Sequence, residues 1–392
     1  MKKQKICVIG GGITGLTVAT TLARPNLHID LIDENFYRNF NTIRTTAISD
    51  SNYAFLKKLN ISNYFDQLSW PCKEMKLYDV HKNSKNIPIL NFDRENKKNN
   101  ILYMVTNEKL SKALKQKIKE NQNIAIKSNI YVSELFSADG LKCIKTFDQK
   151  ILKYNLIIVC TGRNSFLTKK LLEGRYFNND YNEISLTLTV KHKSVKNNIA
   201  RQFFLKEGPL AFLPISNSKT SVIWSIRKNI FYSQKNNKKI FLIKKLKKLS
   251  KEIYKNIKIS SKIERYNLNS HLGDKCFKER VLVFGDALYS VHPLTGQGFN
   301  MILRDLQKLS EIIRRNIALG LDIGSSIVLS EFANDTKSNN FVYSIGIETI
   351  KKIFTTNNVI IKNLRNYCTL QLNKNRNAKN FFINLADKGI NL

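Results

Sequence analysis

Residues 6–16 read ICVIGGGITGL, a short apolar run that ends in a cluster of glycines. The apolar run suits a buried strand, and Gly10, Gly12 and Gly15 follow it at the spacing GxGxxG, directly before a helical pattern. In such a turn the first glycine permits the tight bend, the second lets a pyrophosphate approach the backbone, and the third lets the helix pack closely on the strand. The helix N-terminus then offers N–H donors to the phosphates. The stretch therefore predicts a dinucleotide-binding turn.

The residues that follow complete a βαβ unit. Residues 29–32 read as a second strand, and Asp33 and Glu34 stand at its end. A carboxylate is needed here to accept a hydrogen bond from a ribose hydroxyl, and Asp33 lies 18 residues after Gly15, close to the usual spacing. A purely structural glycine turn is the alternative, but strand, helix and acid occur in the order that binding requires.

The composition limits the class of protein. The chain has 392 residues and a net charge of +35, with 42% hydrophobic residues, so it is long enough for two or three domains, or one large α/β unit with an insert. It has no apolar run of membrane-spanning length and no secretory signal, which predicts a cytoplasmic protein. The six cysteines form no CxxC pair and the five histidines no HxxxH motif, so we expect reduced thiols and no metal site.

The positive charge is spread along the chain, except for one concentrated stretch. Residues 235–262 carry many lysines, and apolar residues recur there at helical spacing, which predicts a basic amphipathic helix. These apolar residues are Leu242, Leu246, Leu249, Ile253 and Ile257. The helix either packs on the body with a solvated lysine face or contacts an anionic membrane or acidic partner. No nucleic-acid-binding motif accompanies the charge.

Other patterns place the remaining elements. Helices are expected at 105–120 and 298–316, and buried strands at 156–159 and 281–284. Between residues 184 and 226 apolar and polar residues tend to alternate, a period close to two that predicts antiparallel strands. The tail, 326–392, reads as helices in which four aromatic residues should pack. These residues are Phe332, Phe341, Phe354 and Phe381.

A second glycine site follows the strand at 281–284. Residues 281–300 read VLVFGDALYSVHPLTGQGFN: a strand, then Gly285 and Asp286, then a glycine-bounded turn that opens a helix. Here the chain resembles the FAD-dependent hydroxylases of ubiquinone biosynthesis, within the aromatic-hydroxylase group of flavin monooxygenases. The resemblance implies that Asp286 bonds the ribityl chain of FAD and that the following stretch passes beside the isoalloxazine ring. The matching residues are His292, Pro293, Gly296, Gln297, Gly298 and Asn300, and Phe299, which lies among them, is also assigned to the cofactor.

Further segments resemble the same family. The run RTTAIS from Arg44 is similar to the family segment whose arginine lies near the flavin, and residues 207–214, EGPLAFLP, to its substrate-side segment. The resemblance also assigns Asn107 and Gly162 to the cofactor. Three positions depart from the family pattern. At two of them a threonine replaces an acid, so a hydroxyl without charge stands where the family has a carboxylate. The three positions are Thr161 for an aspartate, Thr42 for an acid two residues before Arg44, and Tyr289 for a histidine or small residue.

The resemblance implies an α/β fold in three parts. A Rossmann-like FAD-binding domain, mainly a parallel sheet, would comprise residues 1–75, 101–180 and 271–325. An antiparallel β-rich substrate domain would comprise 76–100 and 181–270, and a helical C-terminal segment 326–392. Because only one GxGxxG fingerprint occurs, NAD(P)H should bind transiently, without a domain of its own.

The implied activity is hydroxylation of the aromatic ring of a polyprenylated phenol, with NAD(P)H and O₂, through a C4a-hydroperoxyflavin. His292, Pro293 and Arg44 are the catalytic candidates, with His292 either a proton relay or a positioning residue. An apolar wall that shields the reaction from water is expected, although the same residues also suit an ordinary sheet core. Its residues are Phe203, Phe212, Leu213 and Trp224.

Two other functions remain open at this point. One is another flavin monooxygenase or reductase on the same fold. The other is a non-catalytic flavoprotein that scaffolds proteins of the quinone pathway, motivated by Thr161. A polyprenyl substrate would bring the chain to the surface of the inner membrane, where the lysine-rich helix and the phenylalanine-rich tail would make peripheral contact.

Overall fold

The structure is a computed structural model. It describes residues 3–38, 42–59, 61, 65–80, 87–94, 99–172, 176–234, 237–356 and 358–389.

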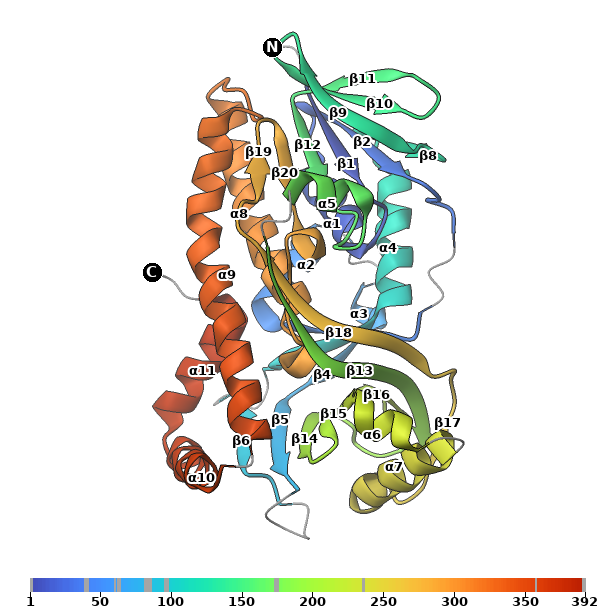
Figure 1. The fold of residues 1–392 in the computed structure, drawn as a ribbon, viewed down its shortest axis with the longest axis vertical. Helices are drawn as coiled ribbons and strands as arrows, with labels where there is room; N and C mark the ends of the chain where they lie inside the picture. Colours follow the sequence, from blue (N-terminus) through green and yellow to red (C-terminus); the bar gives the residue numbers. More distant parts are fainter. Residues whose placement is uncertain are drawn as a thin grey trace.

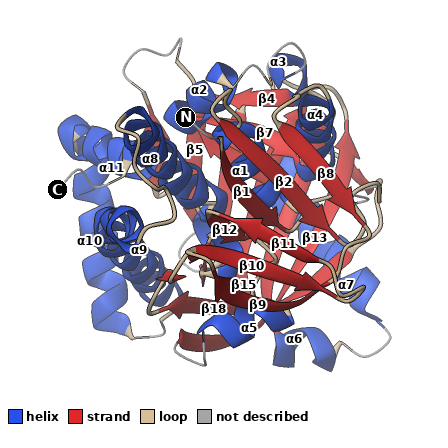
Figure 2. Cartoon of the chain, turned by 90° about the horizontal axis from the view of Figure 1, so that it is seen from above, coloured by secondary structure: helices blue, strands red, loops and turns tan. Residues whose placement is uncertain are grey.

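A parallel sheet forms one end of the molecule (Figure 1). Its strands lie in the order β20–β12–β1–β2–β8, with β19 antiparallel at the edge next to β20. Figure 2 shows β1, β2 and β8 side by side. The strands are β1 (Gln4–Ile9), β2 (Leu27–Asp33), β8 (Ile124–Ser128), β12 (Leu156–Val159), β19 (Phe277–Lys278) and β20 (Val281–Val283).

Both faces of this sheet are covered, which is why β12 and β20 and most of β1 are apolar. One face packs under α1 (Ile13–Leu22), α4 (Asn107–Lys119) and α8 (Gly298–Ala318). The other packs on a three-stranded sheet of β9 (Val132–Ala138), β10 (Leu141–Thr146) and β11 (Ile151–Tyr154). The predicted Rossmann-like unit is confirmed.

A larger, mostly antiparallel sheet lies below it (Figure 1). The order is β21–β18–β13–β16–β15–β14–β5–β6, with β17 also paired to β13 and only β14–β5 parallel. The strands are β5 (Glu74–Asp79), β6 (Leu90–Asp93), β13 (Tyr176–His192), β14 (Ile199–Leu205), β15 (Gly208–Ser216), β16 (Lys219–Arg227), β17 (Ile257–Ile259), β18 (Glu264–Gly273) and β21 (Tyr289–Ser290). The predicted antiparallel segment is confirmed.

Two helices, α6 (Lys228–Ser233) and α7 (Lys238–Tyr254), cover one face of the large sheet. The apolar side of α7 (Leu242, Leu246 and Leu249) is buried against it, so its lysines face solvent. The predicted helix was too long at its C-terminal end. It stops at Tyr254, and Ile257 begins β17, because β17 pairs with β13 and takes over the apolar spacing as a strand.

A small sheet joins the two larger parts of the fold. It consists of β3 (Thr45–Ser49), β7 (Leu102–Thr106) and β4 (Ser69–Cys72), in the order β3–β7–β4. The short helices α2 (Asp50–Lys58) and α3 (Phe65–Leu68) contact this small sheet, whereas α5 (Phe166–Leu172) follows β12 and packs beside the parallel sheet.

The C-terminal segment is helical from Ser326, as predicted. It comprises α9 (Ser326–Thr355), α10 (Val359–Lys374) and α11 (Arg376–Lys388), and α9 runs along one side of the molecule past both large sheets (Figure 1). Phe332 is buried and Phe354 stacks on Phe204. The prediction was wrong for Phe341 and Phe381, which are 49% and 62% exposed, because these side chains lie on helix faces that nothing in the described chain covers.

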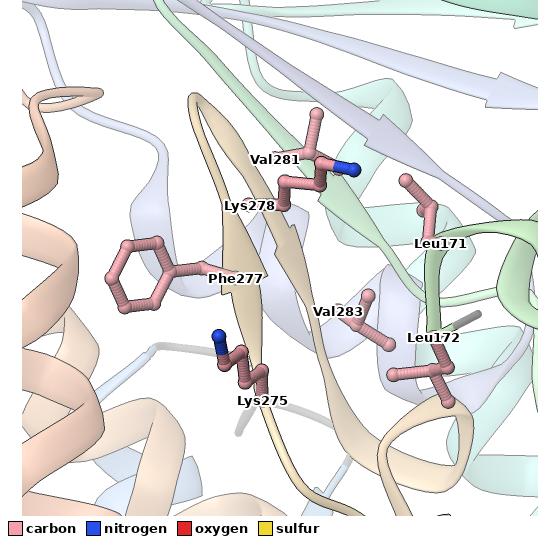
Figure 3. Close-up of a pocket in the computed structure, with 7 residues that line it drawn as sticks. All are labelled: Leu171, Leu172, Lys275, Phe277, Lys278, Val281 and Val283. Carbon is pink, nitrogen blue, oxygen red and sulfur yellow. The ribbon is translucent and has the colours of Figure 1, made fainter. Parts of the chain in front are cut away.

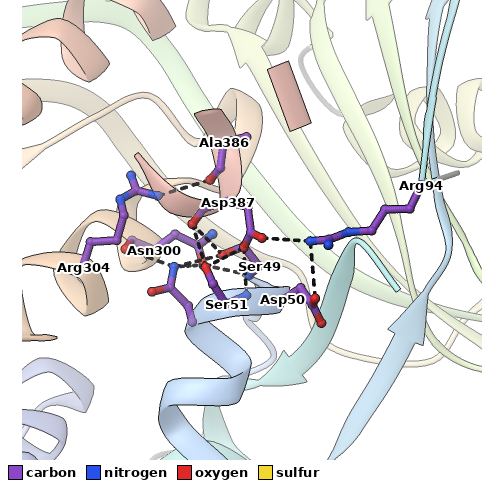
Figure 4. Close-up of polar contacts among 9 residues, drawn as sticks. Ser49, Asp50, Ser51, Arg94, Asn300, Arg304, Ala386 and Asp387 are labelled. Carbon is purple, nitrogen blue, oxygen red and sulfur yellow. Dashed lines mark hydrogen bonds and ion pairs between the residues drawn. The ribbon is translucent and has the colours of Figure 1, made fainter. Parts of the chain in front are cut away.

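The end of α11 is fastened to the start of α2 (Figure 4). The carboxylate of Asp387 accepts hydrogen bonds from the backbone N–H and the hydroxyl of Ser51, at 2.8 and 2.7 Å, and pairs with Arg94 at 2.8 Å. Asn300, in the first turn of α8, accepts from the N–H of Ser49 at 2.9 Å. These contacts join the last helix of the chain to α2, and α8 to the end of β3.

Candidate active site

A pocket of about 810 Å³ opens where the parallel strands end, a volume typical of ligand sites. Ligands of open α/β sheets bind at this edge, beyond the carboxyl ends of the strands. Nine of the residues that the sequence assigned to the cofactor line it. They are Gly10, Gly12, Asp33, Glu34, Arg44, Asn107, Gly162, Asp286 and Phe299.

The glycine turn is shaped for a phosphate-bearing ligand. A Cβ on Gly15 would stand 1.8 Å from the carbonyl oxygen of Gly10, so only glycine allows α1 to begin here. A Cβ on Gly12 would meet no atom within 4 Å. Gly12 borders the pocket, so this open space lies in front of the N-terminus of α1, where backbone N–H groups and the helix dipole favour an anion. The cradle therefore fits the pyrophosphate of a dinucleotide.

The acid at the end of β2 faces the same turn. Asp33 accepts hydrogen bonds from the N–H of Gly11 at 2.6 Å and from that of Asn35 at 2.8 Å. Glu34, beside it, is exposed at the rim. A carboxylate oxygen accepts more than one hydrogen bond, so Asp33 keeps capacity for a ribose hydroxyl.

Arg44 also lines this pocket, where neighbouring residues hold it. Its guanidinium carbon lies 3.6 Å from the centre of the Tyr266 ring, and its carbonyl oxygen accepts from the N–H of Asn107 at 2.8 Å. The hydroxyl of Thr46 donates to the Asn107 side chain at 2.6 Å. Arg44 and Asn107, which the sequence named separately, thus form one structural unit.

The positive charges of two arginines act on Asp286. The protein around it raises the pKa of its carboxyl, and the positive charges of Arg44 and Arg163 oppose that rise. Its side chain still reaches the pocket surface. A carboxylate that is recessed in a pocket but keeps accessible lone pairs is suited to accept hydrogen bonds from hydroxyl groups of a bound cofactor.

The turn after Asp286 is anchored by a buried histidine. The Nε2 of His292 lies 2.8 Å from Glu183, and its Nδ1 accepts the N–H of Leu294 at 3.0 Å, so the ring is neutral with its proton on Nε2. Lys351 of α9 lies 3.1 Å from the same carboxylate. Burial lowers the pKa of His292. Burial alone raises the pKa of Glu183, but His292 and Lys351 outweigh it and hold that pKa below its usual value.

This arrangement engages both ring nitrogens of His292, which is fully buried and does not line the pocket. Its geometry is that of a positioning residue. Gln297 and Asn300 are also buried, and Asn300 donates to the carbonyl of Ala47 at 2.9 Å. Pro293, Gly296 and Gly298 belong to the turn and first residue of α8 that these contacts fix. Gly285 packs against Thr14, close beneath the pocket.

The residues expected to form an apolar wall divide between two faces of the large sheet. Phe203, Phe212 and Trp224 are at most 1% exposed and pack in the core beneath α6 and α7, as the sheet-core alternative describes. Leu213 lies on the opposite face, beside Ala47 and Met104 of the small sheet. The side chains of a strand alternate between faces, and α7 determines which face becomes core.

Several residues that the sequence analysis did not single out contribute to the site. Tyr266 and Thr46 line the pocket, and Arg163 faces Asp286. Tyr266 lies far along the chain in β18, where no local motif marks it. Behind the pocket, Tyr289 donates to the buried Asp305 at 2.6 Å, and burial raises the pKa of Asp305 to about 6. The described residues hold no cluster of His, Cys, Asp or Glu suited to a metal.

A second hollow of about 310 Å³ lies at the edge of the parallel sheet. Leu171 and Leu172 face the β19–β20 hairpin across it, and Lys275 and Lys278 stand at its border (Figure 3). None of the residues assigned from the sequence lines it.

Comparisons with known proteins find relatives over most of the chain. The family model for glucose inhibited division protein A matches residues 5–264, and that for squalene epoxidase matches residues 153–387. A ubiquinone biosynthesis monooxygenase, COQ6, of Dictyostelium discoideum is 25% identical over 97% of this chain and 90% of its own length. The ubiquinone hydroxylase UbiM of Neisseria meningitidis is 22% identical over 92% of this chain and 79% of its own length.

Solved structures share the fold. The p-nitrophenol 4-monooxygenase PnpA of Pseudomonas putida aligns with a TM-score of 0.79 over 99% of this chain and all of its own, at 13% identity. HpxO of Klebsiella pneumoniae, solved in complex with FAD, aligns with a TM-score of 0.78 over 98% of this chain and 99% of its own, at 14% identity.

The fold and the pocket define an FAD-dependent monooxygenase of the aromatic-hydroxylase group. By sequence the chain belongs to the glucose inhibited division protein A and squalene epoxidase families, whose models together match residues 5–387, and it is similar to ubiquinone-biosynthesis monooxygenases over most of its length.

Proposed function

We propose that this chain hydroxylates the aromatic ring of a polyprenylated phenol in ubiquinone biosynthesis, with NAD(P)H as electron donor and O₂ as oxygen source. One oxygen atom would enter the ring, and the other would leave as water with the two electrons of NAD(P)H. The observation that carries the proposal is the similarity to a ubiquinone biosynthesis monooxygenase over 97% of the chain, a length that includes both large sheets and the pocket lined by the glycine turn and Arg44.

The pocket residues have distinct roles in this reaction. The bound FAD supplies electron transfer from NAD(P)H and activation of O₂. The α1 N-terminus and Gly12 bind the pyrophosphate, Asp33 a ribose hydroxyl, and Asp286 further hydroxyls. Arg44 provides positive charge close to Asp286. His292, tied to Glu183, orients the turn that precedes α8. The three-part division of the chain, with Leu213 on the substrate side, is part of the same proposal.

The proposal is tested with the purified holoenzyme, NADH or NADPH, ¹⁸O₂ and a short-chain prenylated phenol. The expected product contains one ¹⁸O atom on the ring, detected by mass spectrometry, with one NAD(P)H consumed per product. If FAD is bound but NAD(P)H is not oxidised even with substrate, the scaffold alternative replaces the proposal. NAD(P)H oxidation that yields only hydrogen peroxide also contradicts hydroxylation of this substrate class.

We also propose that the C-terminal helices bring the enzyme to an anionic membrane surface. No described helix is long and apolar enough to cross a bilayer. On α10, however, Ile360, Leu364 and Tyr367 are 77%, 61% and 62% exposed and recur at helical spacing. The only acids in residues 336–392 are Glu348, which accepts a hydrogen bond from Tyr181, and the buried Asp387, so lysines and arginines dominate the charge there. An apolar face with basic surroundings favours anionic lipid.

Binding to vesicles of phosphatidylglycerol should therefore weaken steeply as salt rises, since the basic residues act through screened charges. Ile360→Asp with Leu364→Asp should reduce binding about tenfold or more, measured by vesicle sedimentation. A matched variant, Lys247→Gln with Lys248→Gln on α7, should change it much less, because the apolar side of α7 is buried in the protein. Binding that ignores both salt and the α10 variant contradicts the proposal.

A further inference from the structure

A single carboxylate outside the pocket ties together two of its walls. Glu264 begins β18, and its side chain is 9% exposed. Its Oε2 accepts the hydroxyl of Thr42 at 3.0 Å and that of Tyr266 at 2.9 Å, while its Oε1 accepts the N–H of Ile43 at 3.3 Å. Lys262 lies 3.2 Å from Oε1. Four donors therefore converge on one nearly buried carboxylate.

These contacts lead directly to Arg44. Thr42 and Ile43 are the two residues before it, and the hydroxyl of Thr42 also accepts the N–H of Arg44 at 3.3 Å. Tyr266 carries the Arg44 guanidinium over its ring. The hydroxyl of Tyr266 is oriented by Glu264, so the backbone and the side chain of Arg44 are both held through the same carboxylate.

Only a charged, two-oxygen acceptor satisfies this arrangement. A glutamine at 264 can keep one oxygen toward Thr42 and Tyr266, but its NH₂ group then faces the N–H of Ile43 and the ammonium of Lys262. Hydrogen-bond donors would then face donors. Partly buried polar groups that lose a hydrogen-bond partner lower the stability of the fold. Burial alone raises the pKa of Glu264, but its hydrogen bonds outweigh this and lower the pKa, which keeps the side chain ionised.

We infer that Glu264 is the positioning residue that sets Arg44 in the FAD pocket, acting across the contact with Thr42 and through Tyr266. It does not line the pocket itself. The carboxylate that fixes the arginine segment is supplied from β18 and not from within that segment, so the large sheet determines the shape of one wall of the cofactor site. The inference rests on FAD binding, and not on the identity of the aromatic substrate.

The test exchanges donor and acceptor across the contact between Thr42 and Glu264. Glu264→Gln should weaken FAD affinity about tenfold, measured by flavin fluorescence on titration of the apoprotein, and should alter the visible circular dichroism of the bound flavin. Thr42→Asp alone should also weaken binding, because two carboxylates then face each other. Combining the two places a carboxylate at 42 opposite an amide at 264, and should restore both affinity and spectrum to near the native values.

Glu279→Gln serves as the matched control, because Glu279 also bridges a hydroxyl and a lysine, Ser137 and Lys142, away from the pocket. It should leave FAD binding unchanged. The melting temperature of each apoprotein shows that the variants fold. The inference is overturned if folded Glu264→Gln binds FAD with native affinity and spectrum, or if the double variant is no better than the worse single one. These readouts need no substrate, so they are independent of whether a prenylated phenol is hydroxylated.

Discussion

Gly12→Ala is expected to abolish most FAD binding while leaving the fold intact. Gly12 has φ −71° and ψ 173°, a conformation that alanine adopts freely, and no atom lies within 4 Å of the position of an added Cβ. That Cβ would occupy the space through which the pyrophosphate approaches the α1 N-terminus. We expect FAD affinity to fall about 100-fold, roughly 2.7 kcal/mol, by fluorescence titration of the apoprotein.

The control for this variant is Gly346→Ala in α9, which also meets no atom within 4 Å but lies away from the pocket. It should retain FAD and gain up to about 1 kcal/mol of stability, since alanine is the better helix former. Gly12→Ala should keep the native melting temperature of the apoprotein. Native FAD affinity in Gly12→Ala would show that the pyrophosphate does not lie against this turn.

Glu183→Ala is expected to cause the largest loss of stability. It removes the ion-pair partner of both His292 and Lys351, which are 0% and 9% exposed at their side chains, and leaves the Lys351 ammonium group with only the weaker attraction of Glu348. Breaking such a pair costs about 3–5 kcal/mol of unfolding free energy, measurable by urea denaturation. FAD affinity should fall as well, because His292 then loses the contact that orients the turn before α8.

Glu74→Ala provides the control, since its ion pair with Lys76 lies on the same large sheet with side chains 34% and 26% exposed. The Glu74→Ala substitution should lower the free energy of unfolding by less than about 1 kcal/mol. In addition, Glu183→Gln combined with Lys351→Met removes both charges and should be more stable than Glu183→Gln alone. If Glu183→Ala lowers the free energy of unfolding no more than Glu74→Ala does, the buried cluster of Glu183, His292 and Lys351 does not stabilise the fold.

The local sequence was sufficient for the nucleotide-binding unit. The apolar run before Gly10, the glycine spacing and the acid at Asp33 each act within one βαβ unit, where short-range sterics and strand–helix periodicity determine the structure. The strand and turn around Asp286 were recognisable for the same reason. Gly10, Gly12, Asp33, Glu34 and Asp286, which lie in these two stretches, line one pocket together with Arg44, Asn107, Gly162 and Phe299, which the family resemblance assigned.

Local patterns were insufficient where two alternatives share the same spacing. Ile257 continues the apolar period of α7 but pairs as β17 with β13. Phe203 and Trp224 alternate correctly for a sheet, yet alternation alone does not say which face α7 covers. Phe381 has the side chain of a core residue, but lies on an uncovered helix face.

The sequence by itself indicated the cofactor class and the glycine and aspartate positions that line the pocket, because the motifs that carry them lie within short stretches of the chain. The tertiary structure decided how the turn before α8 and Arg44 are held. His292 meets Glu183 across 109 residues, and Thr42 meets Glu264 across 222. Thr42 lacks the charge expected at its position, and Glu264 supplies a carboxylate there. Such contacts depend on which strands the folded sheets bring together, and no spacing along the chain encodes that proximity.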